Sequence, residues 1–260
     1  RDRTVKVWLN GACERTIQAH VGDVNAVAVL PGGARFVSGS DDGTAKLWTL
    51  DGALERTFEV GGSVDCVAAL PDGVHFVVGK AGEVRLYHVD GTLVHTFKGH
   101  TEPAWSVAVT PDGQHIISGS EDKLVKVWSV ATKSLVSTCA GHTGGVWAVA
   151  AMPDGQRILS GSADQTVRVW RLNGTLENTF ELHADTVFAL VALPDNQHAL
   201  SGSYDKTVKL FNVNDGAVLR TFTHHTNGVY CLALLPDGRR FVSASQDNTA
   251  RIVEHGLAPL

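Results

Sequence analysis

The chain has 260 residues, of which 43% are hydrophobic and 19% charged, and its 22 Lys and Arg against 27 Asp and Glu give a formal net charge of −5. This composition is typical of a globular protein, and no apolar stretch is long enough to cross a bilayer. The acidic balance argues against nucleic acid as a partner, because nucleic-acid-binding domains normally carry a basic face.

The chain opens on Arg1-Asp-Arg-Thr, which is charged and lacks the apolar core of a signal peptide. The absence of an initiator Met suggests a trimmed sequence. The four cysteines, at 13, 66, 139 and 231, form no CxxC pair and have no metal-ligand spacing. We therefore expect free thiols and an intracellular protein, in the cytoplasm or, as the alternative, in the nucleus.

A unit of about forty residues recurs along the chain, and a period of this length indicates a repeat architecture. One fixed position is a histidine four residues before an apolar strand: His20, His100, His142, His183 and His225. The long interval after His20 has room for a further unit with Val60 in the histidine position. We divide residues 1–260, taken as one domain, into a partial unit and six repeats: 1–19, 20–59, 60–98, 99–140, 141–181, 182–223 and 224–260.

Each repeat contains four short segments of strand character, as repeat 141–181 illustrates. Val146 to Ala151 is apolar throughout, as in a strand buried on both faces, and Pro153-Asp-Gly then ends it. Thr166 to Trp170 alternates polar and apolar residues, and Asn173-Gly predicts a tight hairpin turn into a fourth strand. The other repeats carry the same turn signals: Pro31, Pro71, Pro111, Pro194 and Pro236 in the first turn, and Asn10-Gly, Asp51-Gly, Asp90-Gly and Asp215-Gly in the second.

A four-stranded antiparallel sheet of this kind cannot bury both of its apolar faces alone. Packing sister sheets around a central axis buries these faces and removes long free edges. The sequence therefore predicts an all-β fold, a β-propeller with four-stranded antiparallel blades.

The repeated residues resemble those of the WD-repeat (WD40) β-propeller family across essentially the whole chain. In that family a His, a Ser, an Asp and a Trp form a hydrogen-bonded chain within each blade, and the resemblance implies such structural chains here. Three repeats carry all four residues: His20, Ser38, Asp42 and Trp48; His100, Ser118, Asp122 and Trp128; His142, Ser160, Asp164 and Trp170. Two repeats carry the first three: His183, Ser201 and Asp205; His225, Ser243 and Asp247.

Three repeats depart from this pattern. Phe211 and Val253 stand in the Trp position of the last two repeats and cannot donate an indole N–H, so we expect shortened chains there. In repeat 60–98 the segment Lys80-Ala-Gly-Glu lacks the Asp, and three other positions hold different residues: Val60, Val78 and Tyr87. Because an unpaired buried partner costs about 1–3 kcal/mol, we expect this blade to be the least rigid.

The two ends of the chain leave the number of blades open. Residues 2–8 match the third strand of a blade, and residues 254–260 are too short and too interrupted to form a convincing fourth strand in the last one. In the family, a strand from one terminus completes the blade begun at the other, so residues 13–18 could complete the last blade of a six-bladed closed ring. We prefer a seven-bladed parent that is incomplete at its N-terminus, because the isolated third strand implies a blade upstream.

The recurring Ser, His and Asp residues do not predict a catalytic triad. A triad has one exposed nucleophile with an oxyanion hole, whereas several copies in register are typical of structural hydrogen bonding. No metal-binding or phosphate-binding motif occurs, so we predict no catalytic residue, no metal and no cofactor. A cationic or titratable residue begins each second strand, as a solvated turn residue or as a rim for an acidic partner: Arg35, His75, His115, Arg157, His198 and Arg240.

The most discriminating position follows the first apolar residue of each innermost strand. Around the predicted ring it holds two polar and then four aromatic residues: Asn25, Asp65, Trp105, Trp147, Phe188 and Tyr230. Strand alternation predicts that it lies near the mouth of the central channel, on the face opposite Val24 and Ala26. We expect the residues before the recurring Asp at the same end: Asp41, Glu121, Ala163, Tyr204 and Gln246.

These two sets form a predicted partner-binding arc. Aromatic residues are frequent anchors of protein interfaces, and members of the family often bind peptides at the channel mouth. The alternative is that the rings only pack between neighbouring blades. The acidic residues favour a bound segment that presents Arg or Lys beside an apolar residue.

Three functions follow from the sequence. The arc, the lack of catalytic motifs and the resemblance favour a non-catalytic scaffold that binds proteins or peptides on the face around the channel. The first alternative is an enzyme, a hydrolase or lyase, which would need acid, base or metal ligands in the channel. The second is a structural segment of a larger multidomain protein. We expect the domain itself to be monomeric.

Overall fold

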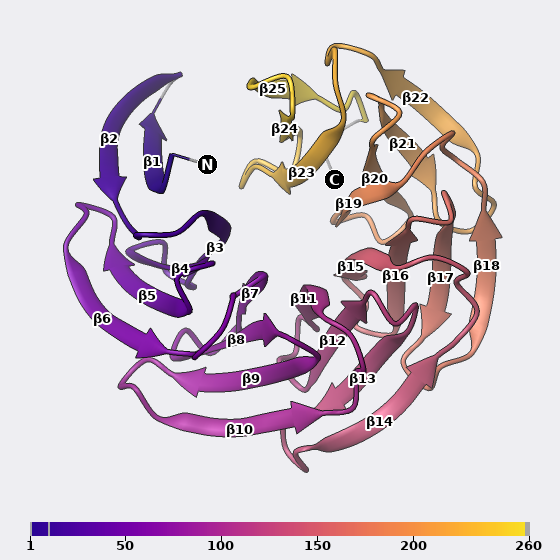
Figure 1. Cartoon of the computed structure of the whole chain (residues 1–260). Helices are drawn as coiled ribbons and strands as arrows, with labels where there is room; N and C mark the ends of the chain where they lie inside the picture. The colour runs from indigo at the N-terminus through magenta and orange to yellow at the C-terminus, as the bar shows by residue number, and fades with distance from the viewer. Residues whose placement is uncertain (1, 10, 258–260) are drawn as a thin grey trace.

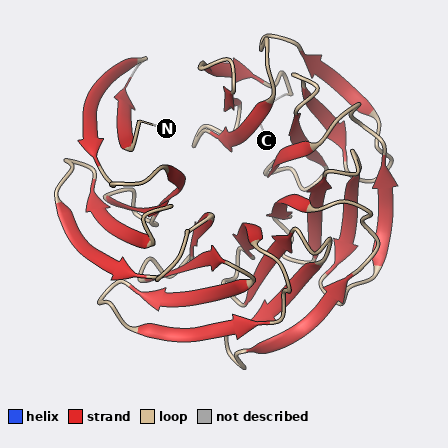
Figure 2. Ribbon diagram, viewed as in Figure 1, coloured by secondary structure: helices blue, strands red, loops and turns tan. Residues whose placement is uncertain are grey.

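The computed structural model describes residues 2–9 and 11–257, and 25 strands within them form seven antiparallel sheets around a common centre (Figure 1). Figure 2 shows strands joined by loops and turns throughout this part of the chain. Within residues 2–9 and 11–257, no helix has the length and apolar character needed to cross a membrane. Asn10, the first residue of one predicted hairpin turn, lies outside the described residues, as do residues 1 and 258–260.

Each sheet takes consecutive strands in chain order. The two-stranded sheet contains β1 (Thr4–Leu9) and β2 (Ala12–Gln18). The five complete blades contain β3 (Val24–Val29), β4 (Arg35–Ser40), β5 (Thr44–Thr49) and β6 (Leu54–Glu59); β7 (Cys66–Ala69), β8 (His75–Lys80), β9 (Glu83–His88) and β10 (Leu93–Lys98); β11 (Ala104–Val109), β12 (His115–Ser120), β13 (Val125–Ser129) and β14 (Ser134–Cys139); β15 (Val146–Ala151), β16 (Arg157–Ser162), β17 (Val167–Arg171) and β18 (Leu176–Phe180); and β19 (Val187–Ala192), β20 (His198–Ser203), β21 (Val208–Asn212) and β22 (Val218–Phe222). The last blade contains β23 (Val229–Leu234), β24 (Arg240–Ser245) and β25 (Ala250–Glu254).

Local turn chemistry sets the strand boundaries, as the fourth blade, β15 to β18, shows. β15 ends before a turn in which the N–H of Gly155, at φ 65°, donates to the carbonyl of Met152 at 2.9 Å. The hairpin from β17 to β18 turns at Gly174, at φ 89°, whose N–H donates to the carbonyl of Arg171 at 2.9 Å. Glycine reaches these positive φ values without a steric penalty, so both predicted turns form where the sequence places them.

The first strand of each complete blade lies nearest the centre of the ring and the fourth lies outermost (Figure 1). The apolar core lies between consecutive blades: Leu159 and Val169 of the fourth blade pack in one cluster with Val187 and Phe211 of the fifth. Gly161 of β16 makes this approach possible, because a Cβ there would lie 2.6 Å from Cγ1 of Val187. Each blade thus buries its apolar face only against its neighbours.

The predicted all-β propeller with four-stranded antiparallel blades is confirmed. Six sheets have three or four strands, which gives the six blades of the alternative count, and the hairpin β1–β2 packs beside the first blade (Figure 1). The alternative in which residues 13–18 close the ring by completing the last blade is contradicted. Among the described residues these pair with β1, where Ile17 lies opposite Val5, because the turn at Gly11 returns the chain directly onto β1. The seven-bladed parent stays a prediction.

Hydrogen-bonded chains run through the five sets of His, Ser and Asp. In the fourth blade, His142 Nδ1 lies 2.8 Å from Asp164 Oδ2 and His142 Nε2 lies 2.7 Å from Ser160 Oγ, which also accepts from Trp170 Nε1 at 2.7 Å. Burial raises the pKa of Asp164, but hydrogen bonds from Thr166, Thr143 and His142 outweigh it and lower the pKa to about 2. An ionised Asp164 can only accept, so Nδ1 of His142 carries the proton and the hydroxyl of Ser160 donates to Nε2.

The shortened chains differ from each other. In the fifth blade, Phe211 has no side-chain N–H, and Ser201 Oγ lies 2.7 Å from His183 Nε2. In the last blade, His224 Nε2 lies 3.0 Å from Ser243 Oγ, on which His225 Nε2 also converges at 2.8 Å. His224 therefore supplies the second hydrogen bond that a Trp supplies elsewhere. The pair His224-His225 is visible in the sequence, but nothing in it indicates this substitution.

The second blade, β7 to β10, replaces the polar chain by apolar packing. Val60 and Val78 are buried with Tyr87 in one cluster that also contains Phe58 and Phe76. The ring of Phe76 stacks on Tyr87 at 5.6 Å, and Phe58 meets both rings edge-on. All members of the hydrogen-bonded chain are replaced in this blade, so the cluster holds no buried polar group that has lost its partner. The expected loss of rigidity assumed such a group. That lower rigidity stays a prediction.

Candidate functional site

The residues of the predicted arc sit at irregularities of the innermost strands. In β15, Val146 lies opposite Ser162 and Ala148 opposite Gly161, so Trp147 between them has no partner in β16. The register shifts in the same way at the positions of four other residues of the arc: Asn25, Trp105, Phe188 and Tyr230. A bulge of this kind redirects a side chain relative to regular strand alternation. Asp65 directly precedes β7, and its N–H donates to the carbonyl of Gly79 at 3.1 Å.

A cavity of about 1370 Å³ lies at the centre of the ring and receives these side chains. All six residues at the arc position of the innermost strands line it: Asn25, Asp65, Trp105, Trp147, Phe188 and Tyr230. Its wall also includes Asp2, Lys6 and Trp8 from the N-terminal hairpin region. Sequence reasoning missed these three, because only the folded ring brings residues 2–8 next to the inner strands.

The aromatic residues form a continuous series from blade to blade. The rings of Trp105 and Trp147 stack with centroids 4.8 Å apart, Trp147 meets Phe188 at 5.3 Å, and Phe188 meets Tyr230 at 4.7 Å. Trp105, Trp147 and Phe188 are half-buried and Tyr230 is exposed. The rings therefore pack across the blade boundaries and also line the cavity, and their role in partner binding stays a prediction.

The opposite side of the cavity carries two carboxylates. Asn25 Nδ2 donates to Asp41 Oδ1 at 2.6 Å, and the hydroxyl of Ser63 lies 2.8 Å from the same oxygen and 2.6 Å from Asp65 Oδ1. Burial raises the pKa of Asp65, and the nearby charge of Asp41 adds to this increase. The single hydroxyl proton of Ser63 can serve only one of the two carboxylates at a time, so the pair retains capacity to accept from a ligand.

The residues before the recurring Asp differ in their relation to the cavity. Asp41 lines it directly. Glu121 Oε2 accepts from Trp105 Nε1 at 2.8 Å, and the ring of Tyr204 meets those of Phe188 and Tyr230 at 6.2 and 6.3 Å. Gln246 is exposed, and its N–H donates to the carbonyl of Gly228. Glu121 and Tyr204 thus contact rings of the arc.

The candidate metal ligands and nucleophiles of the described residues are constrained in three ways. Among residues 2–9 and 11–257 no group of three or more His, Cys, Asp or Glu side chains could hold a metal ion. Ser38, Ser118, Ser160, Ser201 and Ser243 are all fully buried, so none can reach a substrate as a nucleophile. Burial also raises the pKa of the Cys66 and Cys231 thiols in the cavity wall, which keeps them protonated at neutral pH.

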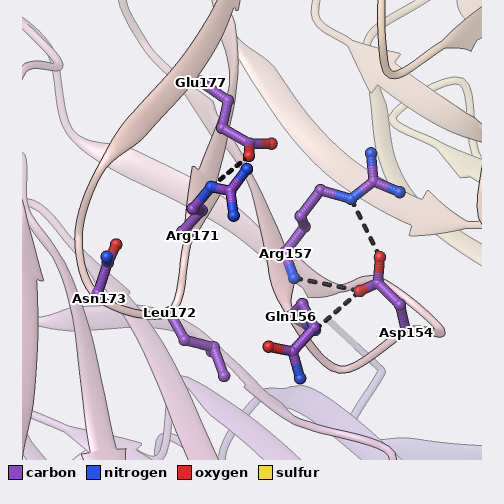
Figure 3. Close-up of a pocket in the computed structure, with 7 residues that line it drawn as sticks. All are labelled: Asp154, Gln156, Arg157, Arg171, Leu172, Asn173 and Glu177. Carbon is purple, nitrogen blue, oxygen red and sulfur yellow. Dashed lines mark hydrogen bonds and ion pairs between the residues drawn. The ribbon is translucent and has the colours of Figure 1, made fainter.

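A second cavity, of about 410 Å³, lies beside the fourth blade (Figure 3). Figure 3 shows the Arg157 side chain directed at Asp154, 3.1 Å away, and Arg171 directed at Glu177, 2.6 Å away. Its cations are thus already paired. Most residues of the predicted rim lie against a nearby carboxylate: His75 against Asp72, His198 against Asp195, Arg240 against Asp237 and Arg35 against Glu55.

The comparison with protein families connects these features to known proteins. The model described as "WD domain, G-beta repeat" matches residues 11–49, 91–129, 133–171, 174–212 and 216–254. Each match begins at or just before a fourth strand (β2 for the first) and runs to the end of the following third strand. The matched segments leave out residues 50–90, which include most of the second blade with its apolar replacement of the polar chain.

A curated relative has a similar sequence. The small ribosomal subunit protein RACK1y of Oryza sativa subsp. japonica is 30% identical over 141 residues, an alignment that covers 50% of this chain and 42% of the relative. The alignment therefore takes in less than half the length of that protein. With five family matches over most of its length and a ring of antiparallel blades, the chain belongs to the WD-repeat family.

Proposed function

We propose that the protein is a non-catalytic scaffold that binds a peptide or a protein segment in the central cavity, at the arc of Trp105, Trp147, Phe188 and Tyr230. The observation that carries this proposal is that one cavity holds a continuous aromatic series and, across from it, the carboxylates of Asp41 and Asp65. Aromatic side chains lose little conformational entropy on binding and anchor many interfaces.

The chemistry of the cavity also defines the segment that fits it. A basic side chain can bind the acidic pair and supply the donors that Ser63 alone cannot, while a neighbouring apolar residue packs on the rings. The partner is therefore a protein or peptide with Arg or Lys beside an apolar residue, not nucleic acid or a membrane. An intracellular location and a monomeric domain belong to the same proposal.

Family membership supports binding over catalysis. The relative from Oryza sativa is named as a ribosomal subunit protein, which makes that protein a component of an assembly. The cavity gives the enzyme alternative little support. Of the ionisable groups in the described part of its wall, Asp41 and Asp65 share one hydroxyl, the thiols have raised pKa, and the others are Asp2 and Lys6 of the N-terminal hairpin region. A structural role within a larger protein is compatible with the scaffold.

A peptide array tests the proposal. The array pairs Arg or Lys with Leu, Phe or Val at neighbouring positions and includes matched peptides in which Glu replaces the basic residue. We expect the double variant Trp105→Ala/Trp147→Ala to lose about tenfold or more in affinity for the peptides that the native protein binds. The matched control is Leu135→Ala/Val136→Ala on the outer strand β14, where both side chains are 47% exposed.

The charge requirement is tested separately. Asp41→Asn/Asp65→Asn keeps the side-chain shapes and removes both charges, so it should weaken binding of the basic peptides and reduce the preference over the Glu peptides. Circular dichroism and thermal melting establish that each variant is folded. A folded Trp105→Ala/Trp147→Ala variant that retains every ligand would show that the arc is not the binding site.

A further inference from the structure

The acidic side of the central cavity is built where the first two complete blades meet. The inner strands β3 and β7 neighbour each other in the ring, and β7 also contacts β4 (Figure 1). Asp41 lies in the turn between β4 and β5, and Ser63 and Asp65 come just before β7. The contact between the blades therefore brings both carboxylates within hydrogen-bond distance of one hydroxyl.

These three side chains have fewer protons than their short contacts require. Ser63 Oγ lies 2.8 Å from Asp41 Oδ1 and 2.6 Å from Asp65 Oδ1. A hydroxyl donates a single proton, so when both carboxylates are ionised one of the two contacts joins a pair of oxygens without a proton between them. A proton on Asp65 completes both contacts, because Asp65 then donates to Ser63 while Ser63 donates to Asp41.

The surroundings place this proton on Asp65 and not on Asp41. Asp41 Oδ1 also accepts from Asn25 Nδ2 at 2.6 Å, and a second donor favours the ionised form of a carboxylate. Burial raises the pKa of Asp65, and the nearby charge of Asp41 adds to the increase, although the hydrogen bond from Ser63 opposes it. Asp65 therefore takes up a proton at a higher pH than an ordinary aspartate does.

The cations nearest the acidic pair are bound to other groups. Lys6 is the one Lys or Arg in the described part of the cavity wall, and its Nζ lies 3.5 Å from Asp2 Oδ2. Lys80 of β8 lies beside the loop before Ser63, and its Nζ donates to the carbonyl of Val60 at 3.0 Å. A ligand must therefore bring the positive charge that two ionised carboxylates need.

The other titratable groups around the pair are acids. The main-chain carbonyl of Asp23 accepts from the N–H of Asp41 at 3.0 Å, which brings a third carboxylate into the adjacent loop. Glu121 accepts a hydrogen bond from an indole of the arc, and burial raises the pKa of the Cys66 and Cys231 thiols in the wall. Neutral or negative neighbours of this kind do not stabilise a second negative charge on the pair.

We propose that Asp41, Ser63 and Asp65 form a pH-sensitive switch for the cavity: at acidic pH Asp65 holds a proton, and a bound Lys or Arg side chain displaces that proton to the solvent. The O–H bond of Asp65 breaks, its electron pair stays on the carboxylate, and bulk water or buffer takes up the proton. The cation then bonds to two ionised carboxylates, and Ser63 donates to one of them.

The proton and the basic side chain thus compete for the same carboxylate. Affinity for a basic segment therefore rises with pH until Asp65 is fully ionised in the free protein, and it is lost as the pH falls through the raised pKa of Asp65. This inference rests on the proposed function, because it takes the occupant of the cavity to be basic.

The titration of Asp65 is tested in the free protein. Carbon-13 NMR of the carboxyl groups, with the Asp65 signal assigned by its loss in Asp65→Asn, is recorded at each pH at which circular dichroism shows the native fold. We expect a midpoint above the ordinary value of about 4, and a lower midpoint in Asp41→Asn, which lacks the neighbouring charge. Glu59→Gln, which removes an exposed carboxylate from the outer strand β6, is the matched control and should leave the midpoint unchanged. An ordinary midpoint, or the same midpoint in Asp41→Asn, would overturn the proposal.

Binding is tested with the peptide acetyl-Gly-Lys-Leu-Gly-amide and with the matched peptide in which Gln replaces Lys. Below the midpoint, we expect the affinity for the Lys peptide to fall by up to about tenfold per pH unit, and the affinity for the Gln peptide to stay constant. Calorimetry in buffers of different ionisation enthalpy should detect protons released by the Lys peptide alone. In Asp65→Asn the carboxamide can donate to Ser63 as a protonated Asp65 does, so this variant should bind the Lys peptide weakly at every pH.

The switch and the proposed function fail in different ways. If the Lys peptide binds with the same affinity above and below the midpoint, or binds without releasing protons, the switch is wrong while binding in the cavity stands. If the Lys peptide binds no better than the Gln peptide at any pH although Asp65 titrates as expected, the basic occupant of the proposed function is wrong, and the switch as a regulator of that site is overturned with it.

Discussion

The serines of the hydrogen-bonded chains join groups from different strands. Ser160 of β16 contacts both His142 and Trp170, each at 2.7 Å, whereas Ser201 contacts His183 in a blade where Phe211 has no side-chain N–H. Removing the hydroxyl in the fourth blade therefore leaves two buried nitrogens without that partner, and removing it in the fifth blade leaves one.

This difference predicts unequal effects of the same substitution. Because each orphaned buried group costs about 1–3 kcal/mol, we expect Ser160→Ala to lower the free energy of unfolding by about twice as much as Ser201→Ala. Urea denaturation with a constant m-value measures both losses. Equal losses in the two variants would mean that the bond from Trp170 to Ser160 adds nothing to stability.

The buried His–Asp pairs also make stability depend on pH. Burial lowers the pKa of His142, against the opposing effect of Asp164, whose own pKa is lowered to about 2. As the pH falls below about 6.5 the unfolded histidine takes up its proton before the folded one, and below about 4 the unfolded Asp does the same. Both groups therefore stabilise the fold at neutral pH, and this contribution is lost progressively down to a pH of about 2.

We expect the urea midpoint to fall between pH 7 and pH 5, and the fall to be smaller in His142→Gln than in the native protein. His95→Gln, which lies outside the hydrogen-bonded chains, is the control and should retain the native slope. A midpoint that rises on acidification would contradict the assignment of a neutral, buried His142.

At the scale of the element, the second blade shows that an apolar cluster can replace a polar chain. Val78 occupies the position of the buried serine and packs with Phe58, Phe76 and Tyr87. We expect Val78→Ser to lower the free energy of unfolding by about 2–4 kcal/mol, because it loses apolar contacts and introduces an unpaired hydroxyl. Adding Tyr87→Trp should restore about 1 kcal/mol by supplying an indole N–H.

The two single variants and the double variant form a thermodynamic cycle, measured by urea denaturation. The free energy of unfolding of the double variant is compared with the sum of the two single changes. If the double variant is no more stable than this sum predicts, the introduced hydroxyl and the introduced indole do not meet. The cycle thus tests whether this blade retains the geometry of its neighbours.

The inner strands show where prediction from sequence reached its limit. The repeat predicted that one position per strand would lie near the channel, and Trp105 and Trp147 do line the cavity. The reason given, regular alternation, was incomplete, because each of these residues lies at a shift in register. Likewise, His224 contacts Ser243 through ring geometry that no repeat position encodes.

At the scale of the molecule, the repeat alone was enough to predict the propeller, because four-stranded units with two apolar faces have few ways to pack. The closure of the ring by residues 13–18, which the sequence left as an alternative, does not occur, since these residues pair locally with β1 and not with the last blade. Local hairpin pairing loses less chain entropy than pairing across the whole ring. A repeat pattern in the sequence does not indicate this entropy difference, so it could not predict which partner residues 13–18 take.

The ring also predicts a gradient of local stability. The sheets at its two ends have fewer strands, and β2 and β25 consist almost entirely of exposed residues. We expect amide hydrogen exchange to be fastest in β1, β2 and β25 and slowest in the second strands β12 and β16, which are buried between neighbouring blades. Mass spectrometry of exchanged peptides measures this order, and strong protection of β2 would contradict it.

The contact between Gly161 and Val187 has a consequence for the site. Corresponding glycines would place a Cβ 2.6 Å from Val146 at Gly119 and 2.9 Å from Val229 at Gly202. A methyl group at any of these three positions would force the facing valine or its strand to shift away. The distance between neighbouring blades, and with it the span from Trp105 to Tyr230, thus depends on having glycine at these three positions.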